Sequence, residues 1–213
     1  MIEAVDIYKS YGAIKVLESF NLKGEKGDCL SIYGRSGSGK TTLLKILASY
    51  ISPDKGKVFI NGKNVSKLED RELAQLRARV IGFAFQEPLL LPYLTAIENV
   101  VWPVYIQKQV SPSALKEEAI QLLSELGLGK RLDHRPSMLS VGEKKRVDVA
   151  RALLRQPRII IADEPTSNLD SETSALVLNL FRKSTEAKTT VVYSTTSWEI
   201  AQLAEKKISM EPN

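Results

Sequence analysis

Residues 34 to 42 read GRSGSGKTT, a glycine-rich run that ends in a lysine and two threonines. Gly34, Gly39, Lys40 and Thr41 match the phosphate-binding motif G-x-x-x-x-G-K-[ST]. Glycines let the backbone turn so that successive N–H groups face phosphate oxygens, and a following helix N-terminus adds positive potential. We expect Lys40 to reach the β- and γ-phosphates and the Thr41 hydroxyl to ligate Mg²⁺. The run therefore predicts an ATP site that also includes Arg35, Ser36, Gly37, Ser38 and Thr42.

Two acidic residues follow an apolar run at 159 to 164, which reads IIIADE. We expect this run to be a buried strand beside the phosphate loop, with Asp163 at its end. A carboxylate there can hold Mg²⁺ through water, and Glu164 can position or deprotonate an attacking water. Gln86 ends another apolar run, VIGFAF, where its amide either touches the metal and the water or lies on the surface. Together these residues predict nucleotide hydrolysis with Mg²⁺ as the cofactor.

Short apolar runs alternate with helical spacings along the chain. Residues 1 to 33 predict strands with turns at Tyr11-Gly12 and Lys26-Gly27-Asp28, and Asn61-Gly62 predicts a hairpin. Such alternation predicts an α/β fold, with a mainly parallel sheet flanked by helices. The mostly helical stretch from 87 to 156 predicts a subdomain inserted into that sheet. Further strands are expected at 57–61, 80–85, 158–163 and 189–194, and helices at 41–50, 95–107, 112–126, 141–155, 171–186 and 198–204.

The composition is that of an ordinary folded protein, with 213 residues, 43% hydrophobic content and a net charge of +5. The small positive balance either marks a nucleic acid, an anionic lipid or a polyanionic ligand as partner, or has no functional meaning. Cys29 is the only cysteine and is expected to be a buried, inert thiol, which fits a reducing cytoplasm. His134, the only histidine, is expected to be structural. The most apolar segment, PLLLPYLTAI, is too short to span a bilayer, so a partner would have to supply spanning helices.

Residues 139 to 147 read LSVGEKKRV, which resembles the ABC signature LSGGQ followed by basic residues. With the phosphate loop, the Asp163-Glu164 pair and SNLD at 167 to 170, the chain is similar to ABC ATPases from about residue 2 to 208. The resemblance implies one ABC ATPase domain over residues 1–213, with a P-loop NTPase core, an N-terminal antiparallel β subdomain and an α-helical insertion. The core and β subdomain would cover about 1–86 and 157–213, and the helical signature subdomain about 87–156.

The resemblance also implies roles for individual residues. Tyr11 looks like the aromatic that stacks on adenine, and Gln86 like the glutamine that senses the metal and the transporter. The signature residues would contact the γ-phosphate bound by the other subunit, and Asp170 would lie at the dimer seam. A helix N-terminus near Ser140 supplies donors for an anion, although the same residues also fit a plain capping box. The signature set is Ser140, Val141, Gly142 and Glu143.

The sequence departs from the family pattern at Thr196 and Val141, at Ser197, where an acid is common, and mildly at Glu143, which replaces glutamine. Thr196 stands where the family usually has a histidine that bridges the γ-phosphate and the catalytic glutamate. Threonine is shorter and carries no charge, so hydrolysis is either slowed or little affected while Glu164 and Lys40 remain. Val141 replaces the first glycine of the signature, which adds bulk where the partner's nucleotide approaches. We expect docking to be altered and not lost.

Two stretches, HRPSMLSVGEKKRVDVARALL and LLLPYLTAIENVVWP, are similar to the lipoprotein-releasing and macrolide-export ATPases, with the FtsE-like cell-division ATPase as a near neighbour. The resemblance implies an ATP-hydrolysing subunit that dimerises head to tail on ATP, with itself or with a related subunit. It would drive a separate integral-membrane permease, as an export or lipoprotein type system. Its place would be cytoplasmic, peripheral on the inner face of the cell membrane.

Two other functions compete with this interpretation. The first is a weakly hydrolysing, ATP-dependent switch of a membrane complex, which the missing histidine favours. The second is a DNA-repair ATPase, but that class carries a long coiled coil between its nucleotide motifs and no sustained heptads are present here. The basic cluster Lys144, Lys145 and Arg146 is interpreted as a solvated helix face, so no nucleic-acid partner is expected.

Overall fold

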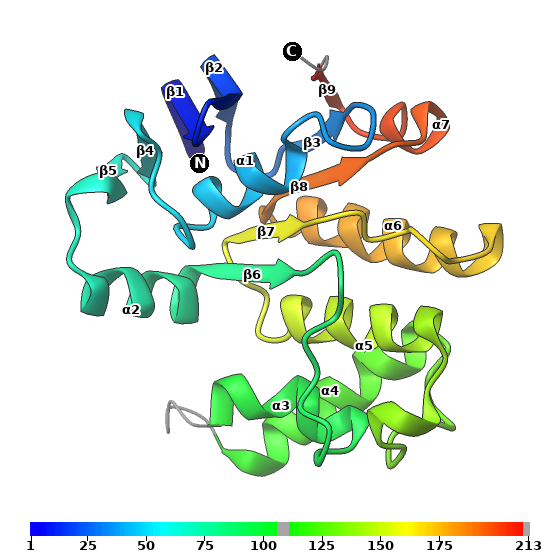
Figure 1. Cartoon of the computed structure of the whole chain (residues 1–213). Coiled ribbons are helices and arrows are strands. Elements are labelled where there is room, and N and C mark those ends of the chain that lie inside the picture. The colour runs from blue at the N-terminus through cyan, green and yellow to red at the C-terminus, as the bar shows by residue number, and fades with distance from the viewer. Residues whose placement is uncertain (106–110, 211–213) are drawn as a thin grey trace.

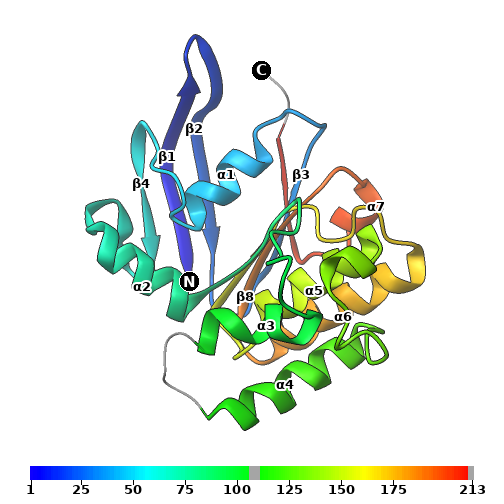
Figure 2. The ribbon, with the colours of Figure 1, turned by 60° about the horizontal axis from the view of Figure 1, so that its bottom comes forward.

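The computed structural model describes residues 1–105 and 111–210 (Figure 1). Its strands form a five-stranded sheet in the order β6-β7-β8-β3-β9 and a four-stranded sheet in the order β2-β1-β4-β5. Helices cover the faces of the larger sheet (Figures 1 and 2). The predicted fold class is confirmed, because the larger sheet is parallel and the smaller one is antiparallel.

All neighbouring strands of the larger sheet run parallel. Their carboxyl ends therefore meet at one edge, which is where ligands bind in open α/β sheets. The segments that leave this edge contain the phosphate loop after β3, Gln86 after β6, Asp163 after β7 and Thr196 after β8. The five strands are β3 (Cys29–Tyr33), β6 (Ile81–Ala84), β7 (Ile159–Ala162), β8 (Thr190–Thr195) and β9 (Lys206–Ser209).

The antiparallel sheet is built from β1 (Ile2–Tyr11), β2 (Ile14–Gly24), β4 (Lys55–Ile60) and β5 (Lys63–Asn64). The predicted turn at Tyr11-Gly12 joins β1 to β2, which pair from Tyr11↔Ile14 to Ile2↔Gly24. The predicted hairpin at Asn61-Gly62 joins β4 to β5, and both turn residues have positive φ, 51° and 79°. Those dihedrals suit a tight two-residue hairpin turn. The strand pairing confirms the first predicted turn, and the pairing with these dihedrals confirms the second.

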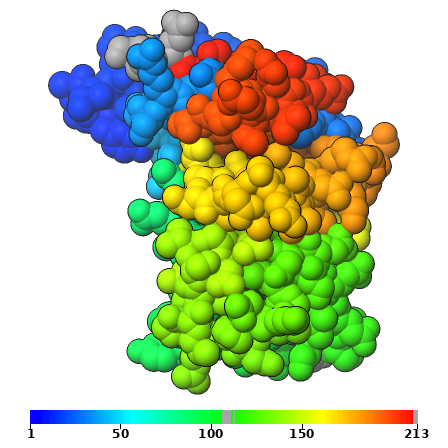
Figure 3. Space-filling model, turned by 90° about the vertical axis from the view of Figure 1, so that its right-hand side faces the viewer, coloured from blue at the N-terminus to red at the C-terminus, as the bar shows by residue number. Residues whose placement is uncertain are grey.

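The helices are α1 (Lys40–Leu47), α2 (Asp70–Val80), α3 (Ala96–Tyr105), α4 (Pro112–Glu125), α5 (Val141–Leu153), α6 (Ser171–Glu186) and α7 (Trp198–Ala201), with 3₁₀ turns at Val65–Lys67 and Pro136–Met138. Helices α3, α4 and α5 pack together below the parallel sheet, and Figure 3 shows this green part beneath α6 and α7. The subdomain boundaries near residues 87 and 156 stay a prediction. Part of the expected helix 95–107 lies outside the described residues.

The parallel sheet separates two apolar cores, and β7 contributes to both because its side chains alternate. Ile160 and Ala162 pack with α3, α4, α5 and α6 on one face. Ile159 and Ile161 pack with α1 and the antiparallel sheet on the other face. The helices α1 and α5 therefore lie on opposite faces of the parallel sheet.

The structure differs from the sequence-based expectation at several elements, among them α1, which was expected over 41–50 and ends at Leu47. Helix α2 was not expected, yet Glu69 and Glu72 form a capping box at its start. Strand β9 was also not expected; it is a short edge strand that pairs only with β3. The last helix, expected over 198–204, ends at Ala201, three residues short.

Candidate functional site

The phosphate loop joins β3 to α1 and is shaped by two crowded glycines. A Cβ on Gly34 would lie 2.4 Å from the carbonyl oxygen of Met210 and 2.7 Å from the Ser38 hydroxyl. Gly39 has φ of 92°, and a Cβ there would lie 2.8 Å from a methyl carbon of Val16. A larger residue fits at neither position without a shift of the backbone. The motif glycines are thus required by close packing as well as by the turn.

Lys40 begins α1 and its ammonium group points back into the loop. Its Nζ donates hydrogen bonds to the carbonyl oxygens of Gly34 at 2.8 Å and Arg35 at 2.9 Å. The same Nζ lies 3.7 Å from Oε1 of Glu164. The lysine is almost fully buried, so its charge acts in a region of low dielectric, where electrostatic interactions are strong.

The remaining loop residues differ in exposure. Arg35, Ser36 and Gly37 are exposed, while Thr41 and Thr42 are half-buried. The Ser38 hydroxyl is one of two buried side-chain groups in the described part of the chain with no hydrogen-bond partner. A buried hydroxyl without a partner costs stability. Its place in the loop is consistent with an anion as the missing acceptor, so the loop fits a phosphate group.

Asp163 and Glu164 follow β7, and both are held by one buried serine. The Ser194 hydroxyl donates to Oδ1 of Asp163 at 2.6 Å and accepts from the N–H of Glu164 at 2.8 Å. Glu164 has φ of 48°, a left-handed conformation that is uncommon for glutamate. The backbone N–H of Thr196 donates to Oε2 of Glu164 at 3.3 Å. Sequence reasoning missed Ser194, whose only signal is a polar residue at the end of an apolar strand.

Burial raises the pKa of the Glu164 carboxyl above its ordinary value, while the Lys40 ammonium and the Thr196 N–H oppose that rise. Burial dominates because removing a carboxylate from water disfavours its charged form. A raised pKa makes the carboxylate a stronger base, which suits a group that withdraws a proton from water.

Oxygen-bearing side chains follow two neighbouring strands, β6 and β7, and one of them reaches the first turn of α1. The Thr41 hydroxyl donates to Oε1 of Gln86 at 3.4 Å, and Asp163 contributes a carboxylate at the next strand end. Hydroxyl, amide and carboxylate oxygens are the donors that Mg²⁺ prefers. Within residues 1–105 and 111–210 no cluster of three His, Cys, Asp or Glu side chains forms a complete metal cage. The residues present fit a Mg²⁺ ion that takes its other oxygens from phosphate and water.

The signature residues form the start of α5. The Ser140 hydroxyl accepts the N–H of Glu143 at 3.1 Å, and Glu143 accepts the N–H of Ser140 at 2.8 Å, which completes a capping box. Arg131 donates to the second oxygen of Glu143 at 2.9 Å. These hydrogen bonds lower the pKa of the Glu143 carboxyl. The capping interpretation is therefore confirmed, and it leaves the remaining N–H groups of the first turn unpaired by the helix.

Gly142 and Val141 face different surroundings. A Cβ on Gly142 would lie 3.0 Å from Leu169 and 3.2 Å from the carbonyl oxygen of Asn168, so the first turn of α5 packs closely on the segment after Glu164. Val141 is 60% exposed. The signature residues contact their own helix and the 167–170 segment, and the sheet separates α5 from α1 within one chain.

Two further predicted residues lie on the surface. Asp170 is exposed and caps α6 by accepting the N–H of Thr173 at 2.8 Å. Tyr11 ends β1 and is 52% exposed, with the ammonium of Lys9 5.7 Å from its ring centroid. An exposed ring at this position is available to stack on a base, although the structure brings it into no contact with the phosphate loop.

One sequence-based interpretation was wrong. Lys145, assigned to a solvated helix face, is 1% exposed and donates to the carbonyl oxygens of Phe85 and Gln86. Arg146 is half-buried and donates to the carbonyl oxygen of Leu126 at 2.9 Å. Both side chains turn inward because α5 lies between the parallel sheet and the helices α3 and α4. Only Lys144 of the cluster has no side-chain hydrogen bond to the described residues.

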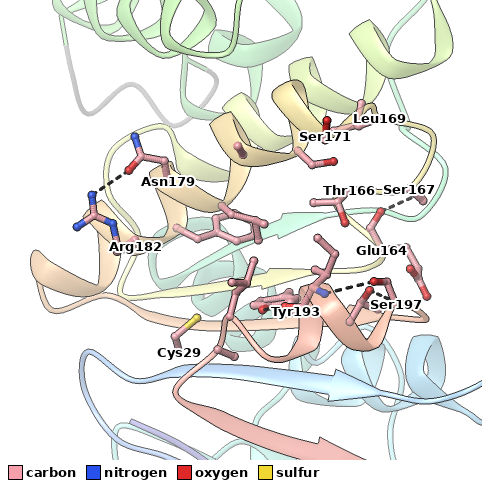
Figure 4. A pocket seen from close by; sticks show the side chains of 18 of the residues that line it. Cys29, Glu164, Thr166, Ser167, Leu169, Ser171, Asn179, Arg182, Tyr193 and Ser197 are labelled. Carbon is pink, nitrogen blue, oxygen red and sulfur yellow. Dashed lines mark hydrogen bonds between the residues drawn. The ribbon is translucent and has the colours of Figure 1, made fainter.

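Glu164 opens into a groove of about 920 Å³ between α6 and α7 (Figure 4). Thr166, Ser167 and Ser197 surround Glu164 at one end, and Cys29 lies at the other end. The groove connects the nearly buried carboxylate to the surface. Cys29 is half-buried and burial raises its pKa to about 11, so the thiol stays protonated at neutral pH, as its predicted inertness requires.

This combination of a phosphate loop after β3, paired acids after β7 and a capped signature helix defines an ATP-binding cassette. The sequence profile of the ABC transporter family matches residues 17–167, so the chain belongs to that family. It is an ATP-binding subunit of the ABC class and an ATPase by family. Among residues 1–105 and 111–210, no helix has both the length and the apolar character needed to cross a bilayer.

The chain resembles named relatives over nearly its whole length. It is 43% identical to the lipoprotein-releasing system ATP-binding protein LolD of Aquifex aeolicus (strain VF5), covering 99% of this chain and 94% of that protein. It is 42% identical to the macrolide export ATP-binding/permease protein MacB of Shewanella sp. (strain W3-18-1), covering 99% of this chain but 33% of that protein. The predicted resemblance to the lipoprotein-releasing and macrolide-export ATPases is confirmed.

Solved structures agree with the fold. The dimeric post-hydrolysis state of the ATP-binding cassette MJ0796 bound to ADP and Pi matches with a TM-score of 0.94 and 35% identity. That match covers 100% of this chain and 97% of the other. A dimeric structure of the same cassette matches with a TM-score of 0.94 and 36% identity. These structures support dimerisation of this chain.

Proposed function

We propose that this chain hydrolyses ATP with Glu164 as the base that activates water. The observation that supports this most is the convergence of Lys40 and Glu164, whose charged groups lie 3.7 Å apart at the shared edge of the parallel sheet. Lys40 and the loop N–H groups would hold the β- and γ-phosphates. Thr41, Gln86 and Asp163 would hold Mg²⁺, which neutralises charge on the phosphates. Tyr11 would stack on the adenine.

The second half of each ATP site would come from another subunit. The N-terminus of α5 presents unpaired N–H groups and positive potential, which suit the γ-phosphate of ATP. Within one chain α5 and α1 pack on opposite faces of the sheet, which supports a phosphate loop and a signature that would meet between two chains. Head-to-tail pairing would place Ser140, Val141 and Gly142 against the partner's ATP, with Asp170 at the seam.

The surface beside β6 would bind the partner, which would be a permease in the membrane. A groove of about 580 Å³ runs between α2 and α3, lined by residues that include Phe85, Leu89 and Arg77. Leu89 is 62% exposed and Tyr93 is 84% exposed. An apolar rim of this kind suits an amphipathic helix of a partner. The chain would then act at the cytoplasmic face of the membrane, and an export or lipoprotein system is the type that its named relatives favour.

Replacing Glu164 tests the assignment. Glu164→Gln keeps the shape and removes the base, so we expect turnover to fall at least about a hundredfold while ATP binding persists. Without hydrolysis the ATP-bound dimer should accumulate. Turnover and size-exclusion chromatography with Mg²⁺-ATP measure both effects. A variant that stays monomeric at saturating ATP contradicts the dimer model, and one that hydrolyses ATP normally contradicts the role of Glu164.

The alternative function is an ATP-dependent switch that hydrolyses slowly. The observation that favours it is Thr196, which offers Glu164 only its backbone N–H and whose side chain is exposed. Turnover measured with the permease present distinguishes the two. A motor accelerates with its partner, while a switch stays slow and still forms the ATP-bound dimer.

A further inference from the structure

Three side chains on one face of α5 hold the chain segment that follows β6. Lys145, Asp148 and Arg151 are spaced three residues apart, so they lie along the same side of the helix. All three form hydrogen bonds with the backbone of residues 85 to 89. Nothing in the sequence motifs assigns a role to this group of charged residues.

Lys145 binds the carbonyl oxygens of two successive backbone residues. Its Nζ donates to the carbonyl oxygen of Phe85 at 3.2 Å and to the carbonyl oxygen of Gln86. The side chain is 1% exposed. Burying an ammonium group is costly unless its donors are satisfied, so these two carbonyls are required acceptors for the lysine.

Asp148 and Arg151 fix the same segment from the next two turns. Oδ2 of Asp148 accepts the N–H of Phe85 at 2.6 Å, and its Oδ1 accepts from Arg151. Arg151 also donates to the carbonyl oxygen of Leu89 at 2.6 Å. Both polar backbone groups of Phe85 are thus bound by charged side chains of α5. Charge-assisted hydrogen bonds are stronger than neutral ones, so the segment is held firmly to the helix.

Gln86 is the residue whose side chain this arrangement orients. Its backbone carbonyl is bound by Lys145, while its Oε1 accepts from the Thr41 hydroxyl at 3.4 Å. One residue therefore connects the first turn of α1 with the helix that begins at the signature. A displacement of α5 would move the Gln86 backbone relative to Thr41, because the Lys145 side chain ties that backbone to α5.

We propose that Lys145 is a positioning residue for Gln86, which it holds at the distance from Thr41 needed to complete the metal-binding oxygens. The inference rests on the proposed function, because it takes Gln86 and Thr41 as ligands of Mg²⁺. The Lys145 ammonium donates to the Phe85 and Gln86 carbonyls, and its charge also acts on Asp163 and Glu164, so we expect its effect mainly on binding that needs the metal. Partners that orient metal ligands typically change metal affinity by about 10- to 100-fold.

The test compares ATP affinity with Mg²⁺ and with EDTA in the full chain. Wild type should bind ATP more tightly with Mg²⁺. Lys145→Met, which keeps the length and loses the donors, should reduce this Mg²⁺-dependent gain about tenfold and leave affinity in EDTA within about twofold. Lys145→Arg should restore most of the gain. Lys116→Met, an exposed charge loss on α4, serves as the matched control and should match wild type.

A second comparison separates positioning from simple structural support. In a Gln86→Ala background, Lys145→Met should produce no further loss of the Mg²⁺-dependent gain, because the residue that it orients is already gone. If Lys145→Met does not fold, Lys145→Gln takes its place in both measurements. Equal losses with and without Mg²⁺, or additive effects in the double variant, overturn the proposal. A wild type without any Mg²⁺-dependent gain would instead refute the proposed metal site.

Discussion

At the scale of single residues, the surroundings of Glu164 decide what its carboxylate can do. Glu164 is 9% exposed, and the Lys40 ammonium and the Thr196 N–H lie close to its oxygens. The Ser194 hydroxyl fixes the backbone of Glu164 and the side chain of Asp163 together. The Asp163 carboxylate is thus held by a short hydrogen bond from Ser194, while Glu164 accepts a longer one from the Thr196 N–H.

The raised pKa of Glu164 predicts a shift in the pH dependence of hydrolysis. A base acts only when ionised, so the rate should fall as pH drops through the pKa of Glu164. Because burial raises this pKa, the fall should begin above 4.5, the ordinary value for glutamate. The pH profile of kcat/KM for ATP measures it, with circular dichroism as the check that the protein stays folded. A rate that is constant from neutral pH down to 4.5 contradicts the assignment.

Thr196 offers a second test at this scale. Its side chain is exposed, so a histidine can be accommodated there without repacking. Thr196→His should raise turnover about tenfold, since an imidazole can bridge the phosphate and Glu164. Thr196→Ala is the control and should change little, because the contact with Glu164 comes from the backbone N–H. An unchanged rate in the histidine variant means that the threonine does not limit hydrolysis.

At the scale of elements, the sequence was most informative where a turn or loop motif adjoined a helical or strand periodicity of apolar residues. The phosphate loop, the hairpin at Asn61-Gly62 and helix α6 were all predicted, because glycine turns and apolar spacings act locally. Helix α2 was missed because none of its residues is fully buried. Leu73, Leu76 and Val80 give it only a partly buried stripe. Its capping glutamates were the signal that could have revealed it.

Tertiary contacts explain the remaining misses. Strand β9 contains two lysines and takes its conformation from pairing with β3, which no local pattern shows. Lys145 was expected in solvent because lysine is rarely buried, and only the packing of α5 against the segment after β6 reveals its acceptors. The candidate ATP site was predicted from motifs residue by residue and stays a prediction, whereas the contacts that orient its residues could not be predicted.

The packing of β6 against α5 predicts a large effect from one methyl group. A Cβ on Gly82 would lie 1.8 Å from the carbonyl oxygen of Ala152, so β6 and α5 must separate to admit it. Gly82→Ala should destabilise the protein by about 3 kcal/mol, the upper end for overpacking, or about 6–12 °C in Tm. Gly129→Ala, which meets only the Ser124 side chain, is the control. Equal melting temperatures for the two variants contradict the close approach.

At the scale of the whole molecule, the two halves of the ATP site lie on opposite faces of one sheet. The α1 core and the α5 core lie on opposite faces of the sheet, and Gln86 joins the first turn of α1 to α5 at the edge of the sheet. Under the proposed pairing, a single chain does not enclose ATP between its own loop and its own signature. The arrangement makes catalysis a property of two chains, which can be tested without knowledge of the permease.

Val141 allows the signature to be disabled with little harm to the fold. Val141 is 60% exposed and is the first residue of α5. An acidic residue at a helix N-terminus stabilises the helix, so an acidic substitution there should not unfold α5. Val141→Glu should place a negative charge against the partner's γ-phosphate and lower turnover at least about tenfold, while the similarly sized Val141→Gln should be milder. Equal effects of the two variants would show that bulk and not charge acts at this position.

Mixing two inactive variants tests the head-to-tail geometry directly. Lys40→Met removes the phosphate lysine, and Val141→Glu disables the signature, so each homodimer has two defective sites. A mixed dimer contains one site built from the intact loop of the Val141→Glu chain and the intact signature of the Lys40→Met chain. An equal mixture should therefore show more ATPase activity than either variant shows alone. If both motifs acted within the same chain, mixing would restore nothing, because every chain would still carry one broken half of its own site.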